Sequence, residues 1–151
     1  CGSLGRVEPT LRRALEGDLA ACRELLTACA LPTQGLERSF PAGYVVARSG
    51  ERLVGCAGVE RHEADGLLRS VAVAADVRGG GLGERLVRDR IVDARAQGLA
   101  SLWLLTTTAA GFFGRLGFAV IGRVDAPEAL RASDEFAHVC PAAAVCMRMA
   151  L

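Results

Sequence analysis

Apolar residues recur along these 151 residues at two spacings, one typical of strands and one typical of helices. Alternating or continuous apolar runs of four to eight residues predict strands, whereas apolar positions three or four residues apart predict helices. The predicted strands are Thr10–Ala14, Tyr44–Arg48, Leu53–Glu60, Leu67–Val73, Leu102–Thr106, Phe118–Val124 and Val145–Met149. The predicted helices are Leu19–Cys29, Leu82–Gly98, Ala109–Leu116 and Pro127–Val139.

Residues that favour turns and helix ends separate these segments. Asp18 is the expected N-cap of the first helix, and Leu31–Pro41, with two prolines and a glycine, predicts a loop. The pair Asp65-Gly66 predicts a hairpin turn that returns Leu67–Val73 antiparallel beside Leu53–Glu60. A tight two-residue turn there would set His62 opposite Arg69, and a looser turn would set Glu60 there.

The segments from Leu67 to Thr106 form a strand, a helix and a strand. Such a unit joins two parallel strands by a right-handed crossover. With 151 residues, the chain fits a single domain, residues 1–151. Residues 1–5 are expected to lie outside its folded part, as a disordered or foreign end.

Composition narrows the class of protein. Apolar residues make up 51% of the chain and the net charge is +1, so we expect a folded globular protein and no nucleic-acid partner. No apolar run approaches the roughly 20 residues of a membrane span, and Cys1–Val7 lack a signal pattern, so no membrane partner and a cytoplasmic location are expected. None of the six cysteines forms a C-x-x-C pair. Reduced thiols and no metal are therefore predicted.

The glycines between the strand Leu67–Val73 and the following helix have a specific spacing. The stretch Arg78-Gly79-Gly80-Gly81-Leu82-Gly83 reads R-x-x-G-x-G. Glycine lets the backbone approach a ligand closely, and the first turn of a helix offers unpaired N–H donors at the positive end of its dipole. The stretch therefore predicts an anion site suited to phosphate, although a structural turn remains open. It lacks the G-K-[ST] of a Walker loop and the G-x-G-x-x-G of a dinucleotide fold.

Two motifs resemble one family. LLRSVAVAADVRGGGLGERLV is similar to the acetyl-coenzyme A motif of the GNAT N-acetyltransferases, and GFFGRLGF (Gly111–Phe118) is similar to their downstream helix signature. The resemblance implies an α/β (α+β) fold with a mixed, mostly antiparallel central sheet flanked by helices, and with a splayed pair of parallel strands. It also implies acetyl-CoA as co-substrate, and it admits a homodimer, because the family often forms dimers.

The resemblance assigns cofactor roles to particular residues. The pyrophosphate would be held by Arg78, Gly79, Gly80, Gly81, Leu82 and Gly83. The pantetheine arm and the thioester would lie along Val71, Ala72 and Val73, and Phe112 would line the pantetheine channel. Many relatives place a tyrosine in the downstream helix as acid to the leaving thiolate, but Phe113 stands at that position.

Within the superfamily, the chain resembles the small arsenic-resistance-associated N-acetyltransferases and, more distantly, the acetyltransferase domain of N-acetylglutamate synthases. The residues that carry this resemblance are LLRSVAV, LLTTTAAGFFGRLGF and PEALRASDEFAHVCPAAAVCM, although Ala143 stands where a serine is expected. The implied activity is acetylation of the α-amine of a small acidic amino acid or an analogue, including an arsenic- or phosphorus-containing glutamate mimic. N-acetylglutamate synthesis and acetylation of a protein terminus are alternatives.

The candidate chemical groups each have a second, structural interpretation. Glu60 can deprotonate the amine through water, or be a charge at a strand end. Arg69 can bind a substrate carboxylate, or form an ion pair with Glu60 or a neighbour. Thr106 and Thr107 can orient the substrate, or simply end a strand.

Other chemical groups fit a different class of function. His62 and His138 are expected at the surface. The missing tyrosine leaves a non-catalytic acyl-CoA sensor open, and Cys140 with Cys146 leaves a thiol-based arsenic binder open.

Overall fold

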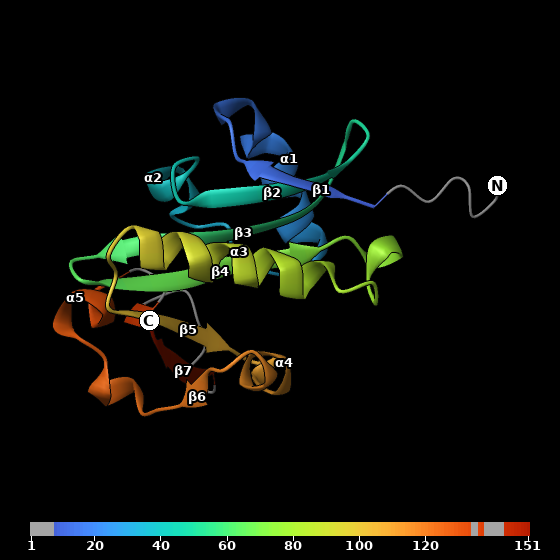
Figure 1. The fold of residues 1–151 in the computed structure, drawn as a ribbon. Helices are drawn as coiled ribbons and strands as arrows, with labels where there is room; N and C mark the ends of the chain where they lie inside the picture. The colour runs from blue at the N-terminus through green and yellow to red at the C-terminus, as the bar shows by residue number, and fades with distance from the viewer. Residues whose placement is uncertain (1–7, 134–135, 138–143) are drawn as a thin grey trace. The chain divides into compact units, whose positions relative to one another are not determined.

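The structure is a computed structural model that describes residues 8–133, 136–137 and 144–151. Figure 1 shows the strands and helices coloured in chain order from the N-terminus to the C-terminus. The strands are β1 (Thr10–Arg13), β2 (Tyr44–Ser49), β3 (Arg52–His62), β4 (Asp65–Val73), β5 (Ser101–Thr106), β6 (Ala119–Val120) and β7 (Val145–Ala150). The α-helices are α1 (Leu19–Ala28), α2 (Leu36–Ser39), α3 (Leu82–Ala96), α4 (Ala110–Arg115) and α5 (Glu128–Arg131). Single 3₁₀ turns are η1 (Glu16–Asp18), η2 (Ala75–Val77) and η3 (Arg123–Asp125).

Over the described residues, the strands form one seven-stranded sheet in the order β1-β2-β3-β4-β5-β7-β6. The pairs β1–β2, β2–β3, β5–β7 and β6–β7 are antiparallel, whereas β4 and β5 are parallel. The parallel register joins Asp65–Leu67 to Ser101–Trp103, which are the first three residues of each strand. The predicted mixed, mostly antiparallel sheet with one parallel pair is therefore confirmed.

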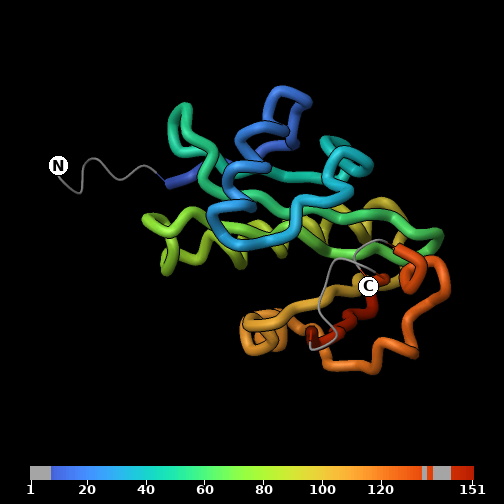
Figure 2. Tube along the Cα trace, turned by 180° about the vertical axis from the view of Figure 1, so that it is seen from behind, coloured from blue at the N-terminus to red at the C-terminus, as the bar shows by residue number. Residues whose placement is uncertain are grey.

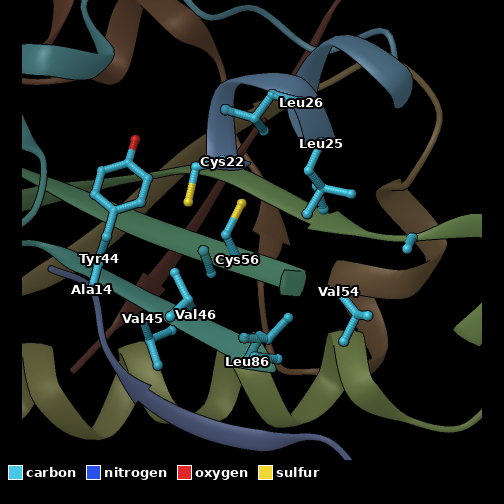
Figure 3. Packing of buried hydrophobic residues seen from close by; sticks show 14 of the residues in the cluster. Ala14, Cys22, Leu25, Leu26, Tyr44, Val45, Val46, Val54, Cys56 and Leu86 are labelled. Carbon is cyan, nitrogen blue, oxygen red and sulfur yellow. The ribbon is translucent and has the colours of Figure 1, made fainter. Parts of the chain in front are cut away.

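By its internal contacts the chain divides into two compact units. The first contains the residues up to Gly58 together with Ser70–Asp89. Its core lies between α1 and α3, with the strands β2 and β3 between the two helices (Figure 3). Leu26 of α1, Val46 of β2 and Leu86 of α3 are fully buried there. Apolar residues on both sides of these strands explain why β2 shows a continuous apolar run rather than an alternating one.

The second unit contains Val59–Arg69 and Arg90–Leu151. Here β7 runs antiparallel to β5, with Leu104 opposite Met147. Figure 2 shows the chain trace from behind, with the last residues of the chain in red. Its core includes Leu67, Trp103, Leu130 and Cys146. The buried indole Nε1 of Trp103 donates a hydrogen bond to Ser101 Oγ at 2.9 Å, which satisfies the one polar atom of that side chain.

The predicted hairpin turn at Asp65-Gly66 is wrong. Both residues belong to β4, and the chain turns two residues earlier, at Glu63-Ala64. A Cβ on Gly66 would lie 2.8 Å from Val59 Cγ1 and 2.9 Å from Leu102 Cδ2, so this glycine serves close packing rather than a turn. The Asp65 carboxylate accepts a hydrogen bond from the Ser101 hydroxyl and thereby joins the first residues of the parallel pair.

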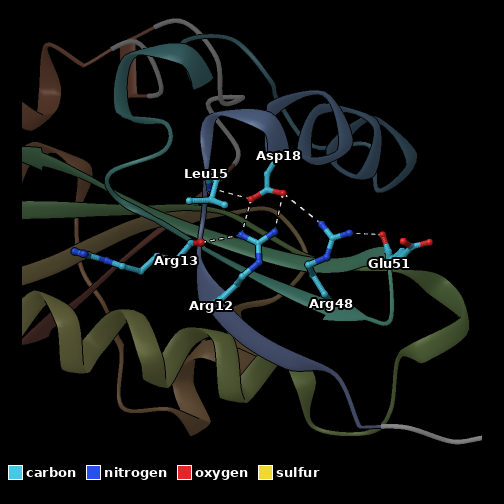
Figure 4. Close-up of polar contacts among 6 residues, drawn as sticks. All are labelled: Arg12, Arg13, Leu15, Asp18, Arg48 and Glu51. Carbon is cyan, nitrogen blue, oxygen red and sulfur yellow. Dashed lines mark hydrogen bonds and ion pairs between the residues drawn. The ribbon is translucent and has the colours of Figure 1, made fainter.

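Asp18 occupies the residue before α1 as predicted, but its side chain does not cap that helix. Its buried carboxylate instead accepts hydrogen bonds from Arg12 Nη1 at 2.8 Å, from Arg12 Nη2 at 3.0 Å and from the Leu15 N–H at 2.8 Å. Arg48 Nη1 lies 3.3 Å from the same carboxylate (Figure 4). Asp18 thus ties β1 and β2 to the chain that leads into α1, an arrangement we call the Asp18 clamp.

Three other predicted segments differ from the structure. Only Ala119–Val120 of the predicted strand Phe118–Val124 pairs with β7, and η3 follows. The predicted helix Pro127–Val139 is α5, and the loop Leu31–Pro41 contains α2. Beyond α5, the Ser133 hydroxyl donates to Leu130 O at 2.6 Å and accepts from the Phe136 N–H at 3.4 Å. His138, Cys140 and Ala143 lie outside the described residues.

Candidate active site

The predicted anion site lies in the first unit, where an exposed loop leads into α3. Gly79 has φ +89° and Gly81 has φ +83°, a conformation that L-residues with a Cβ rarely adopt. A Cβ built on either residue would meet no atom within 4 Å, so it would project into open space beside the backbone. Helix α3 begins at the next residue, Leu82, and its first N–H groups are free of the i→i−4 pattern. The loop therefore offers a backbone surface that fits a phosphate group.

Arg78 fixes the loop to the end of β4. Its Nε donates to Val73 O at 3.0 Å, and its Nη2 lies 3.4 Å from Cys29 Sγ. These contacts tie the exposed Arg78 side chain, at the start of the loop, to the end of β4 and to Cys29. A role for Arg78 toward a pyrophosphate then includes holding this backbone in place.

The predicted pantetheine strand, Val71, Ala72 and Val73, forms the last part of β4. Ala72 is buried and the two valines are half-buried, and Ala74 N donates to Val54 O at 2.8 Å where the strand ends. Both the strand and the glycine loop belong to the first unit. The chain thus runs without interruption from the strand predicted for the thioester to the loop predicted for the pyrophosphate.

A separate charged cluster lies in the second unit, formed by Glu60, His62 and Arg69. Arg69 Nη1 donates to Glu60 Oε2 at 2.9 Å, and His62 Nε2 lies 2.9 Å from Glu60 Oε1. The side chain of Arg69 is 2% exposed, that of Glu60 is 15% exposed and that of His62 is 21% exposed. We call these three residues the Glu60 cluster.

Burial and charge act in opposite directions on Glu60. Burial by itself would raise the pKa of this carboxyl group, but the hydrogen bond with His62 and the positive charge and hydrogen bond of Arg69 outweigh it. The pKa of Glu60 is consequently lower than its ordinary value. At neutral pH Glu60 is an anion that holds Arg69 and His62, and it can accept further hydrogen bonds, because a carboxylate has about four acceptor positions.

The sequence allowed Arg69 to form an ion pair with Glu60 instead of binding a substrate. This ion pair is present in the structure, and it is buried rather than exposed. His62, expected at the surface, is half-buried and paired with Glu60. The two sequence-based readings of the hairpin each brought one of these partners to Arg69. The structure instead places Arg69 and His62 on one carboxylate, that of Glu60.

Thr106 is the last residue of β5, and Thr107 is the residue after it. Thr106 Oγ1 accepts a hydrogen bond from the Ala109 N–H at 3.0 Å and so shapes the turn into α4. Thr107 is exposed in that turn. The hydroxyl hydrogen of Thr106 can still be donated, so a role in orienting a substrate remains a prediction.

Phe112 and Phe113 take different positions on α4. Phe113 is buried and stacks edge-to-face on Phe118, with ring centroids 5.8 Å apart. Phe112 is half-buried and packs against Phe113 at 5.0 Å. Phe113 is thus a core residue, and of the two it is Phe112 that keeps exposed surface for a ligand.

Sequence reasoning missed Tyr44 and Ser70. Ser70 lies within β4 but has φ +59°, and its Oγ is 2.9 Å from the Tyr44 hydroxyl. Tyr44 is the single tyrosine of the chain, which is the one signal in the sequence that could have drawn attention to it. A serine in a left-handed conformation carries no sequence signature of its own.

A mixed sheet with one parallel pair, followed by a glycine loop at the start of a helix, defines a small α/β domain built to hold a phosphate-bearing ligand. A family model described as "Acetyltransferase (GNAT) domain" matches residues 41–120, which include β2, β3, β4, the glycine loop, α3, β5 and α4. The chain therefore belongs to the GNAT acetyltransferase family. The matched residues include the whole stretch Val71–Gly83.

Solved structures share the fold. An N-acetylglutamate synthase from Neisseria gonorrhoeae, in complex with coenzyme A and L-arginine, has a TM-score of 0.79 at 23% identity. The match covers 97% of this chain and 34% of the synthase chain, so the present chain spans about a third of that protein. Rv2747 from Mycobacterium tuberculosis, in complex with CoA and NLQ, has a TM-score of 0.80 at 25% identity over 95% of this chain and 99% of its own. A GNAT-family acetyltransferase from Staphylococcus aureus has a TM-score of 0.79 at 16% identity over 95% and 99% of the two chains.

Within residues 8–133, 136–137 and 144–151, no three His, Cys, Asp or Glu side chains are grouped so that they could hold a metal ion. None of the helices described there has the length and apolar character to span a membrane.

Proposed function

We propose that this chain transfers the acetyl group of acetyl-CoA to the α-amine of a small amino acid that carries an acidic side chain, or of an analogue of such an amino acid. The observation that carries the proposal is the buried guanidinium of Arg69 in the Glu60 cluster. A buried positive charge favours an anionic ligand, and a guanidinium matches the geometry of a carboxylate. The neighbouring residues along the chain, Val71–Gly83, belong to the part that matches the acetyltransferase family.

The residues have separate roles in this proposal. The backbone of Gly79, Gly80 and Gly81 holds the pyrophosphate, while Arg78 braces the loop. Acetyl-CoA supplies the acetyl group as a thioester, and N–H groups of Val71–Val73 polarise its carbonyl. Arg69 binds the substrate carboxylate.

Proton removal from the amine is assigned to Glu60. The amine must lose a proton before it can attack the thioester, and the Glu60 carboxylate takes that proton through a water molecule. Because the pKa of Glu60 is lowered, the group is ionised at neutral pH and has the free acceptor positions that this step needs. His62, whose Nε2 lies 2.9 Å from Glu60 Oε1, is the next group along this route.

Two observations bear on the substrate. The N-acetylglutamate synthase from Neisseria gonorrhoeae has also been crystallised with coenzyme A and N-acetyl-glutamate, at a TM-score of 0.80 to this chain. This likeness favours glutamate itself as the amine. The resemblance of the sequence to arsenic-resistance-associated acetyltransferases favours a glutamate mimic with an arsenic or phosphorus oxyanion in place of the side-chain carboxylate. The shared chemistry is an α-amine next to one carboxylate, with a second anionic group on the side chain.

Release of free thiol from acetyl-CoA, measured against a panel of amines, tests the proposal. The panel contains glutamate, aspartate, glutamine as the uncharged match of glutamate, a phosphinate analogue and an arsenic-containing analogue of glutamate, and a short peptide with a free N-terminus. We expect anionic amino acids to accelerate thiol release well above hydrolysis and glutamine to be a poor substrate. The 151 residues contain no lysine, so no side-chain amine of the protein competes for the acetyl group.

The same measurements separate the alternatives. Acceleration by the peptide alone would assign the chain to protein N-terminal acetylation. Binding of acetyl-CoA without turnover of any amine would overturn the enzyme proposal and favour an acyl-CoA sensor. A thiol-based arsenic binder would bind trivalent arsenic in the absence of acetyl-CoA; of its two cysteines, Cys146 is buried, which raises the pKa of its thiol, and Cys140 lies outside the described residues.

A further inference from the structure

Ser70 has an unusual backbone conformation for its place in a strand. It lies between Arg69 and Val71 in β4, yet its φ is +59°. A residue with positive φ inside a strand interrupts the alternation of side chains and turns the N–H and C=O groups that follow it. The turn therefore falls between the residue proposed to bind the substrate and the residues proposed to bind the thioester.

Tyr44 holds the side chain of Ser70. The Tyr44 hydroxyl is 2.9 Å from Ser70 Oγ, and the tyrosine is 1% exposed (Figure 3). Its ring packs against Phe40 at 5.2 Å between centroids and covers Gly58, where a Cβ would lie 2.3 Å from Tyr44 Cζ. The ring has no room to move toward β3, so the hydroxyl has a fixed position.

Cys56 holds the carbonyl of the same serine. Its Sγ donates to Ser70 O at 3.2 Å, and the side chain is fully buried. The hydrogen bond with Cys22 and then burial raise the pKa of the Cys56 thiol well above its ordinary value. Cys56 therefore keeps its proton and remains a donor, and Figure 3 shows its sulfur turned toward that of Cys22.

We infer that Tyr44 is a positioning residue for acetyl-CoA: together with Cys56 it locks Ser70 in the left-handed conformation that directs the backbone of Val71–Val73 toward the thioester. This inference rests on the proposed function and adds to it a residue that acts through the strand rather than by touching the ligand. All the residues of the lock belong to the first unit, as do the pantetheine strand and the glycine loop. Tyr44 contacts the hydroxyl of Ser70 and Cys56 contacts its carbonyl, so the conformation of Ser70 does not depend on a single hydrogen bond.

The contacts of Tyr44 and Cys56 with Ser70, which we call the Tyr44 lock, predict which part of the cofactor loses affinity when Tyr44 is changed. The nucleotide half of CoA contacts the glycine loop in the proposed function, and the acetylated arm contacts Val71–Val73. Tyr44→Phe removes only the hydroxyl and keeps the ring over Gly58. We expect it to weaken acetyl-CoA binding about tenfold, the upper range for one neutral hydrogen bond, and to leave binding of adenosine 3′,5′-bisphosphate unchanged.

Isothermal titration calorimetry measures the affinities for acetyl-CoA and for adenosine 3′,5′-bisphosphate. The proteins titrated are the wild type, Tyr44→Phe, Ser70→Gly and the double variant. Glycine adopts positive φ without the lock, so in the Ser70→Gly background the tyrosine substitution should cost less than twofold. Ser133→Ala is the matched control, because it also removes a buried hydroxyl bond, at 2.6 Å to Leu130 O, and should leave both affinities unchanged.

The outcomes separate this inference from the proposed function. If the wild type does not bind acetyl-CoA, the proposed function fails. If the wild type binds it and Tyr44→Phe binds it equally well, or weakens both probes alike, or costs the same in the Ser70→Gly background, the positioning role of Tyr44 is wrong. Amide chemical shifts of Val71–Val73 in the ligand-free protein give a second readout: they should move in Tyr44→Phe and stay in place in Ser133→Ala.

Discussion

The glycine loop of the first unit and the Glu60 cluster of the second differ in their exposure and in the chemical groups that they offer to a ligand. The loop is exposed and uses backbone whose two positive-φ glycines open onto space free of other atoms. The Glu60 cluster is buried and uses side chains, with a guanidinium and an imidazole on one carboxylate. A backbone site accepts any ligand of suitable charge and size, whereas a side-chain cluster is specific to the shape and charge of one ligand class.

This difference explains why the sequence predicts the cofactor more specifically than it predicts the substrate. A backbone position with positive φ favours glycine, so the conformation of the loop leaves a pattern of glycines in the sequence. The loop is therefore recognisable as a motif. The pairing of Glu60 with His62 and Arg69 depends on which residues of β3 and β4 reach one another, and no motif records that. Substitutions in the two regions should therefore separate into effects on the amine and effects on acetyl-CoA.

The largest effect is expected for Arg69→Ala. It removes one partner of a buried ion pair, which lowers the free energy of unfolding by about 3–5 kcal/mol. It should also raise the KM for an acidic amine about a hundredfold, as expected when about 3 kcal/mol of charged hydrogen bonding is lost, and leave the Kd of acetyl-CoA unchanged. Urea unfolding and steady-state kinetics measure the two effects.

Two variants accompany that measurement. Arg69→Lys keeps the charge but not the planar fork, so it should recover stability more fully than the KM for the amine. Arg61→Ala is the exposed control on β3, whose guanidinium bonds only backbone carbonyls of Glu63 and Gln97 among the contacts described, and it should change little. Equal increases in the KM for the amine and in the Kd of acetyl-CoA would contradict a role specific to the substrate.

A smaller, pH-dependent effect is expected for Glu60→Gln. The pKa of Glu60 is lowered from 4.5 in the folded protein, so its ionised form stabilises the fold above about pH 4.5, and this contribution is lost as the pH falls through the folded pKa. The variant should be about 2–3 kcal/mol less stable than the wild type at pH 7, and the difference should shrink below pH 4.5. Urea unfolding at a series of pH values measures it. A difference that is the same at pH 7 and pH 3 would show that Glu60 does not contribute as an anion.

The smallest effect is expected in the glycine loop. Gly81→Ala places a Cβ on a residue with φ +83°, which costs about 1–2 kcal/mol and should weaken acetyl-CoA about tenfold without changing the KM for the amine. Gly80→Ala is the matched control in the same loop. Gly80 is not among the positive-φ residues, and its Cβ would lie 3.9 Å from Val77 O, an ordinary contact. If the two alanines weaken acetyl-CoA equally, the conformation of Gly81 is not what the ligand requires.

The sequence predicted most elements because their patterns are local. The strands β2, β3 and β7 and the helix α3 lie within two residues of the predicted bounds. The hairpin was misplaced because Asp-Gly is the residue pair that favours such a turn, whereas Gly66 is small for a different reason, the close approach of Val59 and Leu102. Tertiary packing of this kind is not visible in a window of neighbouring residues.

In the candidate site, too, features that depend on neighbouring residues were predicted, whereas contacts between distant residues were not. The glycine loop was predicted as an anion site from its position before a helix, and Arg69 was singled out because a charged residue interrupts an apolar run; both roles stay predictions. The partners of a buried polar group are set by register, so Asp18 was expected to cap a helix and instead holds two arginines. The Tyr44 lock depends on residues 26 positions apart, and sequence spacing carries no sign of it.

The Asp18 clamp has a consequence for the conditions under which the fold persists. The hydrogen bond from Arg12 lowers the pKa of Asp18 from 3.8, against the effect of burial, so acid removes this contribution only as the pH falls below that value. All 18 basic residues of the chain are arginines, which keep their charge in any solution a protein tolerates. Neither the Asp18 clamp nor the pair of Arg69 with Glu60 can therefore be released by alkali. These two ion pairs should therefore be lost in acid and kept in base, an asymmetry that lysine in the same positions would not provide.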